Sequence, residues 1–336
     1  MSRPSNIPPT KITIQSVADL AGVSIATVSR VLSGNTNVRE DLAKKVREAA
    51  ASLNYTPSAS AQGLAKGRNF TIGILVPDLS NPYFPDVVKG IHNLAAQSNY
   101  RLLVADSDGH PSDEIPIIRD LIRQVDGIIL ISPRMTVSEL KSLENSAIPI
   151  VLVNRMEAGV GLPSVGVDNF SAMSELIGHL ASLGHKRVAF LSGPQESWQQ
   201  RERARAVMHA SNFGISVNEI NAGGSIKSGY DSLDGALKAK PTAAICFNDL
   251  VALGVLARAQ ELGIQIPSEL SVSGFDDIEF SHFSNPPLTT IRSPQIPLGE
   301  AAWTILQDIL EGKSRDHQPL MEAKVVLRQS TGPVAI

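Results

Sequence analysis

The stretch TIQSVADLAGVSIATVSRVLSG, residues 13–34, decides which kind of domain lies near the N-terminus of this chain. Apolar residues recur on one face of residues 14–21, and a second helical pattern follows Gly22. Ser24 is placed to cap the second helix, and Gly34 is placed to end it. Two short helices joined by a glycine turn predict either a helix-turn-helix or an unrelated helical corner.

The apolar positions favour the helix-turn-helix. This motif needs a small residue where the helices cross and apolar residues that lock the second helix onto the first. Ala18 takes the small position, and apolar residues take the locking positions: Val17, Ala21, Val23, Val28 and Val31. The second helix is small and smooth, with a single charge at Arg30, and therefore suits a DNA major groove about 12 Å wide. The pattern predicts a DNA-binding domain, and a third helix is expected at about residues 40–54.

The distribution of charge supports this prediction. The 336 residues are 43% hydrophobic and 19% charged, with a net charge of −3. Residues 1–68 hold nine basic and four acidic side chains, a balance of +5, which leaves −8 for the remainder. A basic head on an acidic body is typical of a DNA-binding module joined to a second domain.

Other features of composition concern the cellular setting. The single cysteine, Cys246, excludes an internal disulfide and suits a reducing compartment. The N-terminal residues lack the apolar segment of a secretory signal, and no apolar run approaches membrane-spanning length. We therefore expect a cytoplasmic protein without a membrane partner.

From residue 70 onward, short apolar runs alternate with helical patterns. The runs are FTIGILV, RLLVAD, GIILI and IPIVLV, followed by RVAFLSG, TAAICF and LSVSGFD. This alternation predicts parallel sheets covered by helices on both faces. Because the second series begins after the glycine-rich EAGVGLPSVGVD, two open α/β subdomains with a ligand cleft between them are expected. The predicted fold class is thus an all-α helix-turn-helix headpiece followed by α/β with two open parallel-sheet subdomains.

Nearly the whole chain resembles the LacI family of bacterial transcriptional repressors. The likeness runs through TIQSVADLAGVSIATVSRVLSG, NYTPSASAQGLAKGR, TIGILVPDLSNPYF, VDGIIL, LGHKRVAFLSGP, FNDLVALG, SVSGFDD and PPLTTIRSP. The resemblance implies a headpiece at residues 1–55, a hinge helix or linker at 56–68, and an effector-binding and dimerisation domain at 69–336. That last domain would be like the periplasmic sugar-binding proteins, with two interleaved subdomains. A homodimer on a near-palindromic double-stranded DNA operator is expected, and no leucine heptad follows residue 330 to suggest a tetramer.

The resemblance assigns roles to residues that would contact DNA. In the family, the first two positions of the recognition helix read base edges; here they are Ile25 and Ala26, which offer only apolar contacts, for instance to a thymine methyl. Arg30 is placed to donate two hydrogen bonds to a guanine. Leu64 occupies the hinge position that wedges into the minor groove. Small hydroxyl residues would hold phosphates: Ser24, Thr27 and Ser29.

The resemblance also implies a small effector in the cleft, either a sugar, a nucleoside or a sugar phosphate. Amides, carboxylates and arginines pair with hydroxyl groups, and aromatic rings cover the apolar side of a sugar. The expected effector residues are Asn81, Tyr83, Phe84, Asn154, Arg155, Arg201, Asn248, Phe275 and Asp276. Arg292 is a further candidate, whereas Asp249 is expected to cap a helix. Ser132 and Ser225 are smaller than the residues that sugar-binding relatives place at these positions.

Enzymatic functions find no support in the motifs. GxGxxG, HExxH and GxSxG are absent, EGKS at 311–314 lacks the upstream glycine of a phosphate loop, and the seven histidines show no metal-ligand spacing. We expect neither an enzyme nor a metal or cofactor. Two alternatives stay open: a global catabolite-type regulator that uses a phosphoprotein corepressor, and, less favoured, a transport-type sugar-binding protein.

Overall fold

The computed structural model describes residues 12–32, 38–55, 68–313 and 320–334. The chain divides into two compact units, Met1–Phe70 and Thr71–Ile336. Most of the predicted hinge, including Leu64, lies outside the described residues, as does Gly34. Among the described residues, no helix combines the length and apolar character needed to cross a bilayer.

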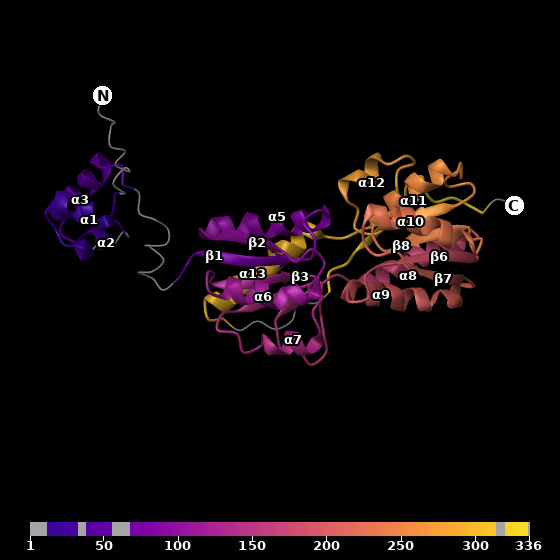
Figure 1. The fold of residues 1–336 in the computed structure, drawn as a ribbon, viewed down its shortest axis with the longest axis horizontal. Helices are drawn as coiled ribbons and strands as arrows, with labels where there is room; N and C mark the ends of the chain where they lie inside the picture. The colour runs from indigo at the N-terminus through magenta and orange to yellow at the C-terminus, as the bar shows by residue number, and fades with distance from the viewer. Residues whose placement is uncertain (1–11, 33–37, 56–67, 314–319, 335–336) are drawn as a thin grey trace, which may run out of the picture. The chain divides into compact units, whose positions relative to one another are not determined.

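The described part of the first unit consists of helices (Figure 1). They are α1 (Ile14–Ala21), α2 (Ile25–Leu32) and α3 (Glu40–Ser52). Val17, Ala18 and Val28 are buried with Val46 and two alanines of α3 in a single core. The third helix ends two residues before the predicted boundary.

Gly22 and Ser24 form the turn between α1 and α2. Gly22 has a φ of 65°, and its N–H donates to the carbonyl groups of Ala18 and Asp19. A Cβ at Gly22 would meet no atom within 4 Å, so the left-handed backbone rather than close packing favours glycine there. The Ser24 hydroxyl accepts a hydrogen bond from the Thr27 N–H at 3.2 Å and caps α2 as predicted. The helix-turn-helix is therefore confirmed.

The first subdomain of the second unit is a five-stranded parallel sheet in the order β2-β1-β3-β4-β5. Its strands are β1 (Thr71–Val76), β2 (Arg101–Asp106), β3 (Gly127–Ile131), β4 (Ile150–Val153) and β5 (Ser164–Val165). Its helices are α5 (Tyr83–Ala95), α6 (Pro111–Ile122), α7 (Val137–Ser142) and α13 (Gln295–Leu310), with a 3-10 turn η1 (Ala96–Ser98). Alternate strand residues face two cores, one of which contains α6 and α7. Helices α5 and α13 pack against each other.

The second subdomain is a four-stranded parallel sheet in the order β7-β6-β8-β9. Its strands are β6 (Arg187–Ser192), β7 (Ser216–Asn221), β8 (Ala243–Cys246) and β9 (Ser271–Ser273). Its helices are α8 (Asn169–Ser182), α9 (Trp198–Met208), α10 (Ile226–Leu237), α11 (Asp249–Glu261) and α12 (Glu279–Phe283), with a 3-10 turn η2 (Ala210–Phe213). Cys246 is buried in the central strand β8. The two parallel sheets confirm the predicted fold class (Figure 1).

The chain passes between the two subdomains more than once. It leaves the first sheet after β5 for α8, and it returns after β10 (Thr290–Arg292) to form α13 against α5. It then pairs β11 (Lys324–Val326) with β10 and ends beside β9, where the Val272 N–H donates to the Ser330 carbonyl. Glycine permits the α5–α13 contact, because a Cβ at Gly90 would lie 2.1 Å from the Ile296 carbonyl oxygen.

Candidate functional site: a cleft between two subdomains

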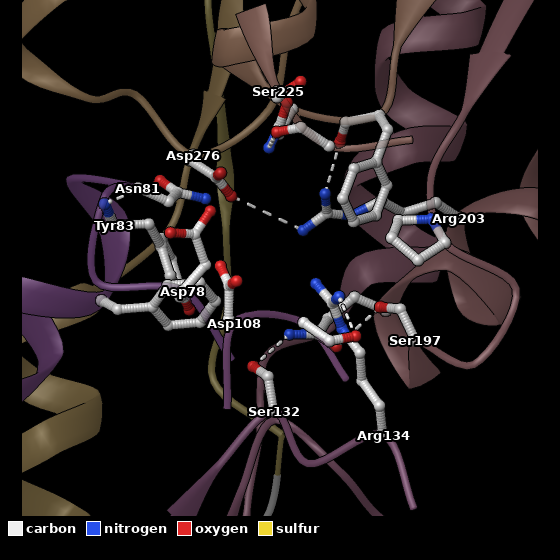
Figure 2. A pocket seen from close by; sticks show the side chains of 17 residues that line it. Asp78, Asn81, Tyr83, Asp108, Ser132, Arg134, Ser197, Arg203, Ser225 and Asp276 are labelled. Carbon is white, nitrogen blue, oxygen red and sulfur yellow. Dashed lines mark hydrogen bonds and ion pairs between the residues drawn. The ribbon is translucent and has the colours of Figure 1, made fainter. Parts of the chain in front are cut away.

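A polar cavity of about 200 Å³ lies where the carboxyl ends of the two sheets meet (Figure 2). Open α/β sheets bind ligands at this edge, because loops after neighbouring parallel strands converge there. Both subdomains contribute to the wall. The lining residues are Asp78, Asn81, Tyr83, Phe84, Asp108, Gly109, Ser132 and Arg134 from the first, and Pro194, Ser197, Gln199, Arg203, Gly224, Ser225, Phe247, Asn248 and Asp276 from the second.

Arg203 on α9 supplies the buried positive charge of the cleft. Its Nε donates to Asn169 at 2.9 Å, and Nη1 donates to the Phe247 carbonyl group. Its Nη2 lies 3.6 Å from the Asp276 carboxylate. Only 4% of the residue is exposed, so its orientation is fixed before any ligand arrives. The guanidinium is a preorganised hydrogen-bond donor.

Asp276 faces Arg203 across the same wall (Figure 2). Its backbone φ is 117°, an unusual value for a residue that has a side chain. Burial raises the pKa of Asp276 to about 8, with the Arg203 charge opposing the rise and the Asp249 carboxylate adding to it. A strained and buried carboxylate beside an arginine marks a candidate ligand contact more strongly than a surface ion pair does.

Tyr83 and Phe84 bring aromatic surface to the first-subdomain side of the cleft. The Tyr83 hydroxyl accepts a hydrogen bond from Asn154 and lies 3.5 Å from the Ser293 hydroxyl. Burial raises the pKa of Tyr83 to about 12. Asn154 has a φ of 56°, and its buried Oδ1 has no hydrogen-bond partner among the described residues. Asn154 therefore supports Tyr83 from behind the cavity wall.

Two buried charges hold the loop 132–135, which carries Ser132 and Arg134 into the cavity. The Glu114 carboxylate accepts from the N–H groups of Arg134 at 2.8 Å and Met135 at 2.8 Å. Arg155 carries the opposite charge, and its guanidinium donates to the carbonyl groups of Pro133 at 2.8 Å and Met135 at 2.6 Å. Burial raises the pKa of Glu114, and the two N–H groups oppose that rise. The loop backbone is thus fixed by a carboxylate and a guanidinium together.

Two polar contacts join the subdomains beside the cavity. Gln199 of α9 donates to the Ser132 hydroxyl at 2.6 Å. Arg201, also on α9, forms an ion pair with Glu157 in the loop after β4. Glu157 pairs in addition with Arg155 at 3.0 Å, so one carboxylate serves an arginine from each subdomain.

The structure brings together five of the nine predicted effector residues at the cavity wall: Asn81, Tyr83, Phe84, Asn248 and Asp276. The other four lie behind or beside it. Asn154 contacts Tyr83, Phe275 packs under Arg203, and Arg155 and Arg201 both pair with Glu157. The Asn248 side chain also caps α11 by accepting from Val251 N–H at 2.9 Å.

Two secondary predictions were wrong. Asn248 rather than Asp249 caps α11; Asp249 is the first helical residue, and its buried carboxylate accepts from the Ser281 hydroxyl at 2.6 Å. Arg292 lies outside the cavity wall and pairs with Asp277 at 2.6 Å. Ser132 and Ser225 do line the cavity, and Ser225 caps α10.

Sequence reasoning missed Arg203 in favour of Arg201. The helical period contained the signal, because Gln199, Gln200, Arg203, Ala206 and Val207 are spaced as one buried stripe. Arg201 falls between these positions, and 43% of its side chain is exposed. Further cavity residues that were missed are Asp78, Asp108, Arg134, Ser197, Gln199 and Phe247.

The predicted DNA-contacting residues of the headpiece lie at the start and along the outer face of α2. Ile25 is 43% exposed, and Ala26 and Arg30 are exposed as well. Ser24 is exposed, whereas Thr27 and Ser29 are half-buried. Ile25 and Ala26 thus present apolar atoms to solvent at the start of α2, beside the exposed Arg30 one turn further along.

Comparison with known proteins identifies the family. The model of bacterial regulatory proteins of the lacI family matches residues 13–58, and that of the periplasmic binding protein-like domain matches residues 177–331. Catabolite control protein A of Priestia megaterium is 32% identical over 95% of this chain and 99% of its own length. The chain belongs to the LacI family of bacterial regulatory proteins. Another LacI-family relative, the HTH-type transcriptional repressor CytR of Escherichia coli K12, is 31% identical over 96% of this chain and 97% of its own.

Solved structures of LacI-family proteins share the fold. The lac repressor dimer bound to operator and the anti-inducer ONPF has a TM-score of 0.86 at 27% identity, covering 96% of this chain and 100% of that chain. A LacI-family regulator from Enterococcus faecium with bound ribose has a TM-score of 0.71 at 26% identity, covering 79% of this chain and 100% of its own. Membership of the LacI family makes this protein a transcriptional repressor rather than an enzyme.

Proposed function

We propose that this LacI-family repressor binds a near-palindromic operator as a homodimer in the cytoplasm, and that a small polyhydroxylated effector in the cleft controls it. The observation that carries the effector proposal is the buried Arg203–Asp276 pair in the wall of the polar cavity. Arginine donors and carboxylate acceptors together match adjacent hydroxyl groups, each of which donates and accepts.

The size and lining of the cavity favour a compact ring. A volume of about 200 Å³ is below the usual range of drug-sized sites, about 300–1,000 Å³. Tyr83, Phe84 and Phe247 offer apolar surface for the face of a ring. A pentose, a hexose or a nucleoside therefore fits the site in chemistry and scale. A relative from the same family was solved with ribose.

The headpiece surface supports operator binding through both apolar contacts and hydrogen bonds to bases. The exposed Ile25 and Ala26 would contact the groove edge through apolar atoms, and the exposed Arg30 would donate to a guanine. Ser24 and Thr27, which share a hydrogen bond at 2.9 Å, would set the start of α2 against phosphates. Leu64 is proposed as the minor-groove wedge from its sequence position alone.

Exposed apolar residues on the second subdomain support a homodimer. Phe280 and Phe283 of α12 are 58% and 76% exposed, and Ile226 at the start of α10 is 48% exposed. Helix α12 is tied to α11 through Ser281 and Asp249, and α10 packs closely on α11. Phe280 and Phe283, three residues apart on one helix, form an exposed apolar surface of the kind that is typical of an interface. Phe283→Asp should convert the dimer to monomer in sedimentation velocity, whereas Phe213→Asp on η2 should not.

A protein corepressor is the second candidate, favoured by the similarity to catabolite control protein A. One thermal-shift screen separates the candidates, using pentoses, hexoses, nucleosides and their phosphates. A ligand at about 100 times its Kd adds about 2.7 kcal/mol, which raises the melting temperature by a few degrees. Asp276→Asn should abolish a selective shift, and Asp231→Asn on the exposed face of α10 should preserve it. A flat panel, together with retention of a phosphoprotein from a sugar-fed lysate, would favour the corepressor.

A further inference from the structure

Glu157 occupies a special electrostatic position beside the cleft. Its Oε1 accepts from Nε of Arg155 at 3.0 Å, lies 3.0 Å from Nη2 of the same residue, and also pairs with Arg201 of α9. Arg155 belongs to the first subdomain and Arg201 to the second. The side chain of Glu157 is 15% exposed, so solvent screens these contacts only in part.

The two arginines repel each other without Glu157. Burial lowers the pKa of Arg155, Glu157 opposes that effect, and the Arg201 charge lowers the pKa further. The side chain of Arg155 is 2% exposed and cannot turn away, because it also holds the carbonyl groups of Pro133 and Met135. A fixed cation of one subdomain therefore faces a cation of the other.

We propose that Glu157 is a positioning residue, a shared counter-ion that holds the two walls of the effector cleft together when no effector is bound. Its charge converts an Arg155–Arg201 repulsion into a bridge between the subdomains. Through Arg155, the same carboxylate is linked to the backbone of the 132–135 loop, which carries two cavity residues. The resting balance between open and closed cleft, on which an effector must act, is then set by this residue. This role rests on the proposed function only in assuming that an effector acts on that balance.

Spin labels at Ser142→Cys on α7 and Ser211→Cys on η2 report the separation of the subdomains in the full-length protein without DNA or effector. Cys246 is buried and should remain unlabelled. Glu157→Gln should increase the ratio of open to closed protein about ten-fold, because it leaves two facing cations. Arg201→Gln should increase it less, by about five-fold, because a single partly exposed ion pair is lost.

The double variant provides the decisive comparison. Adding Arg201→Gln to Glu157→Gln should partly restore closure, because the repulsion disappears with the second charge. Raising the salt concentration from about 0.05 M to about 0.5 M should close Glu157→Gln but open the wild type, since screening weakens repulsion in one and attraction in the other. Arg205→Gln removes a surface ion pair with Glu202 on the same helix and serves as the control. It should leave the ratio of open to closed protein unchanged at both salt concentrations.

Three results would overturn the role. These are an unchanged distance distribution in Glu157→Gln, additive opening in the double variant, or salt effects of the same sign in both proteins. If Glu157→Gln does not fold, the role is tested by Arg201→Gln and by the salt response of the wild type, both of which should show opening. Because neither effector nor DNA is present, such a failure would leave the proposed function standing, and a flat effector screen would leave the Glu157 result standing.

Discussion

The guanidinium carbon of Arg203 lies 3.5 Å from the centre of the Phe275 ring, inside the wall of the cleft. A second ring, that of Phe247, is centred 4.9 Å away. These rings set the plane of the guanidinium, while Asn169 and Asp276 direct its donors. Arginine is suited to this position because it is planar and keeps its charge when buried, whereas lysine would neither stack nor form the same fork of hydrogen bonds.

The first prediction concerns the buried Arg203–Asp276 pair. At about pH 9, above the Asp276 pKa of about 8, Arg203→Met should lower the free energy of unfolding by about 3–5 kcal/mol, because it leaves the Asp276 carboxylate buried without its counter-ion. Arg203→Met combined with Asp276→Asn should recover most of that loss. Urea unfolding followed by tryptophan fluorescence measures both. A double variant no more stable than Arg203→Met would show that the cost comes from packing rather than charge.

The second prediction concerns pH and Asp249. Burial raises the pKa of Asp249 from 3.8 to about 7, although hydrogen bonds from Ser281, Thr290 and the Ile278 N–H oppose the rise. Between about pH 4 and pH 7 the folded protein therefore keeps a proton that the unfolded chain loses. The free energy of unfolding should fall as pH increases through this window, by up to about 1.4 kcal/mol per pH unit. Asp249→Asn should make that slope shallower in urea titrations, and an unchanged slope would contradict the assignment.

The third prediction tests the turn of the headpiece. Gly22→Ala should lower headpiece stability by about 1 kcal/mol, because alanine is strained at a φ of 65° although space is open. Gly235→Ala in α10 provides the matched control: space is open there too, but the backbone is helical, so alanine should stabilise its subdomain slightly. Hydrogen exchange of amides in α1–α3 and in α10 measures the two effects. Equal effects of both substitutions would refute the conformational argument.

The fourth prediction concerns base reading by Arg30. In selection from a random duplex library, Arg30→Ala should lose preference at one base pair of each half-site, a change of about 1–3 kcal/mol. Lys45→Ala on the exposed face of α3 should instead weaken binding to all sequences alike or leave it unchanged. Loss of preference at every position in Arg30→Ala would indicate that the residue supports the helix rather than reading a base.

Local patterns sufficed for most elements, and long-range contacts account for what they missed. The buried strands β1, β3, β4 and β8 are apolar runs that lie where predicted. Strand β7 was not predicted, because SVNEIN lies at a sheet edge and is largely exposed. Helix α13 was not predicted either. Its place beside α5 depends on a contact between residues far apart in the chain, which no local period reveals.

In the candidate site, too, local sequence predicted some residues, and long-range contacts determined the others. Strand-end position predicted Asn81, Tyr83 and Asp276 at the cavity, since loops after parallel strands converge. It could not show that Arg155 turns toward the 132–135 loop or that Arg201 turns toward Glu157. Those orientations depend on partners in other loops and, for Arg201, in the other subdomain. Residue type located the site, and tertiary contacts decided which charges face the ligand.

The return of the chain to build α13 against α5 has a consequence for synthesis on the ribosome. The first sheet, whose last strand ends at residue 165, lacks one of its covering helices until Gln295–Leu310 has left the exit tunnel. During that interval the face beside α5, where Gly90 meets Ile296, is without its native cover. We expect nascent chains stalled after β9 to be sensitive to protease and to bind chaperones, and chains extended beyond α13 to become resistant. The first subdomain therefore cannot complete its fold before most of the second has been synthesised. The cleft between them forms only when both subdomains are complete.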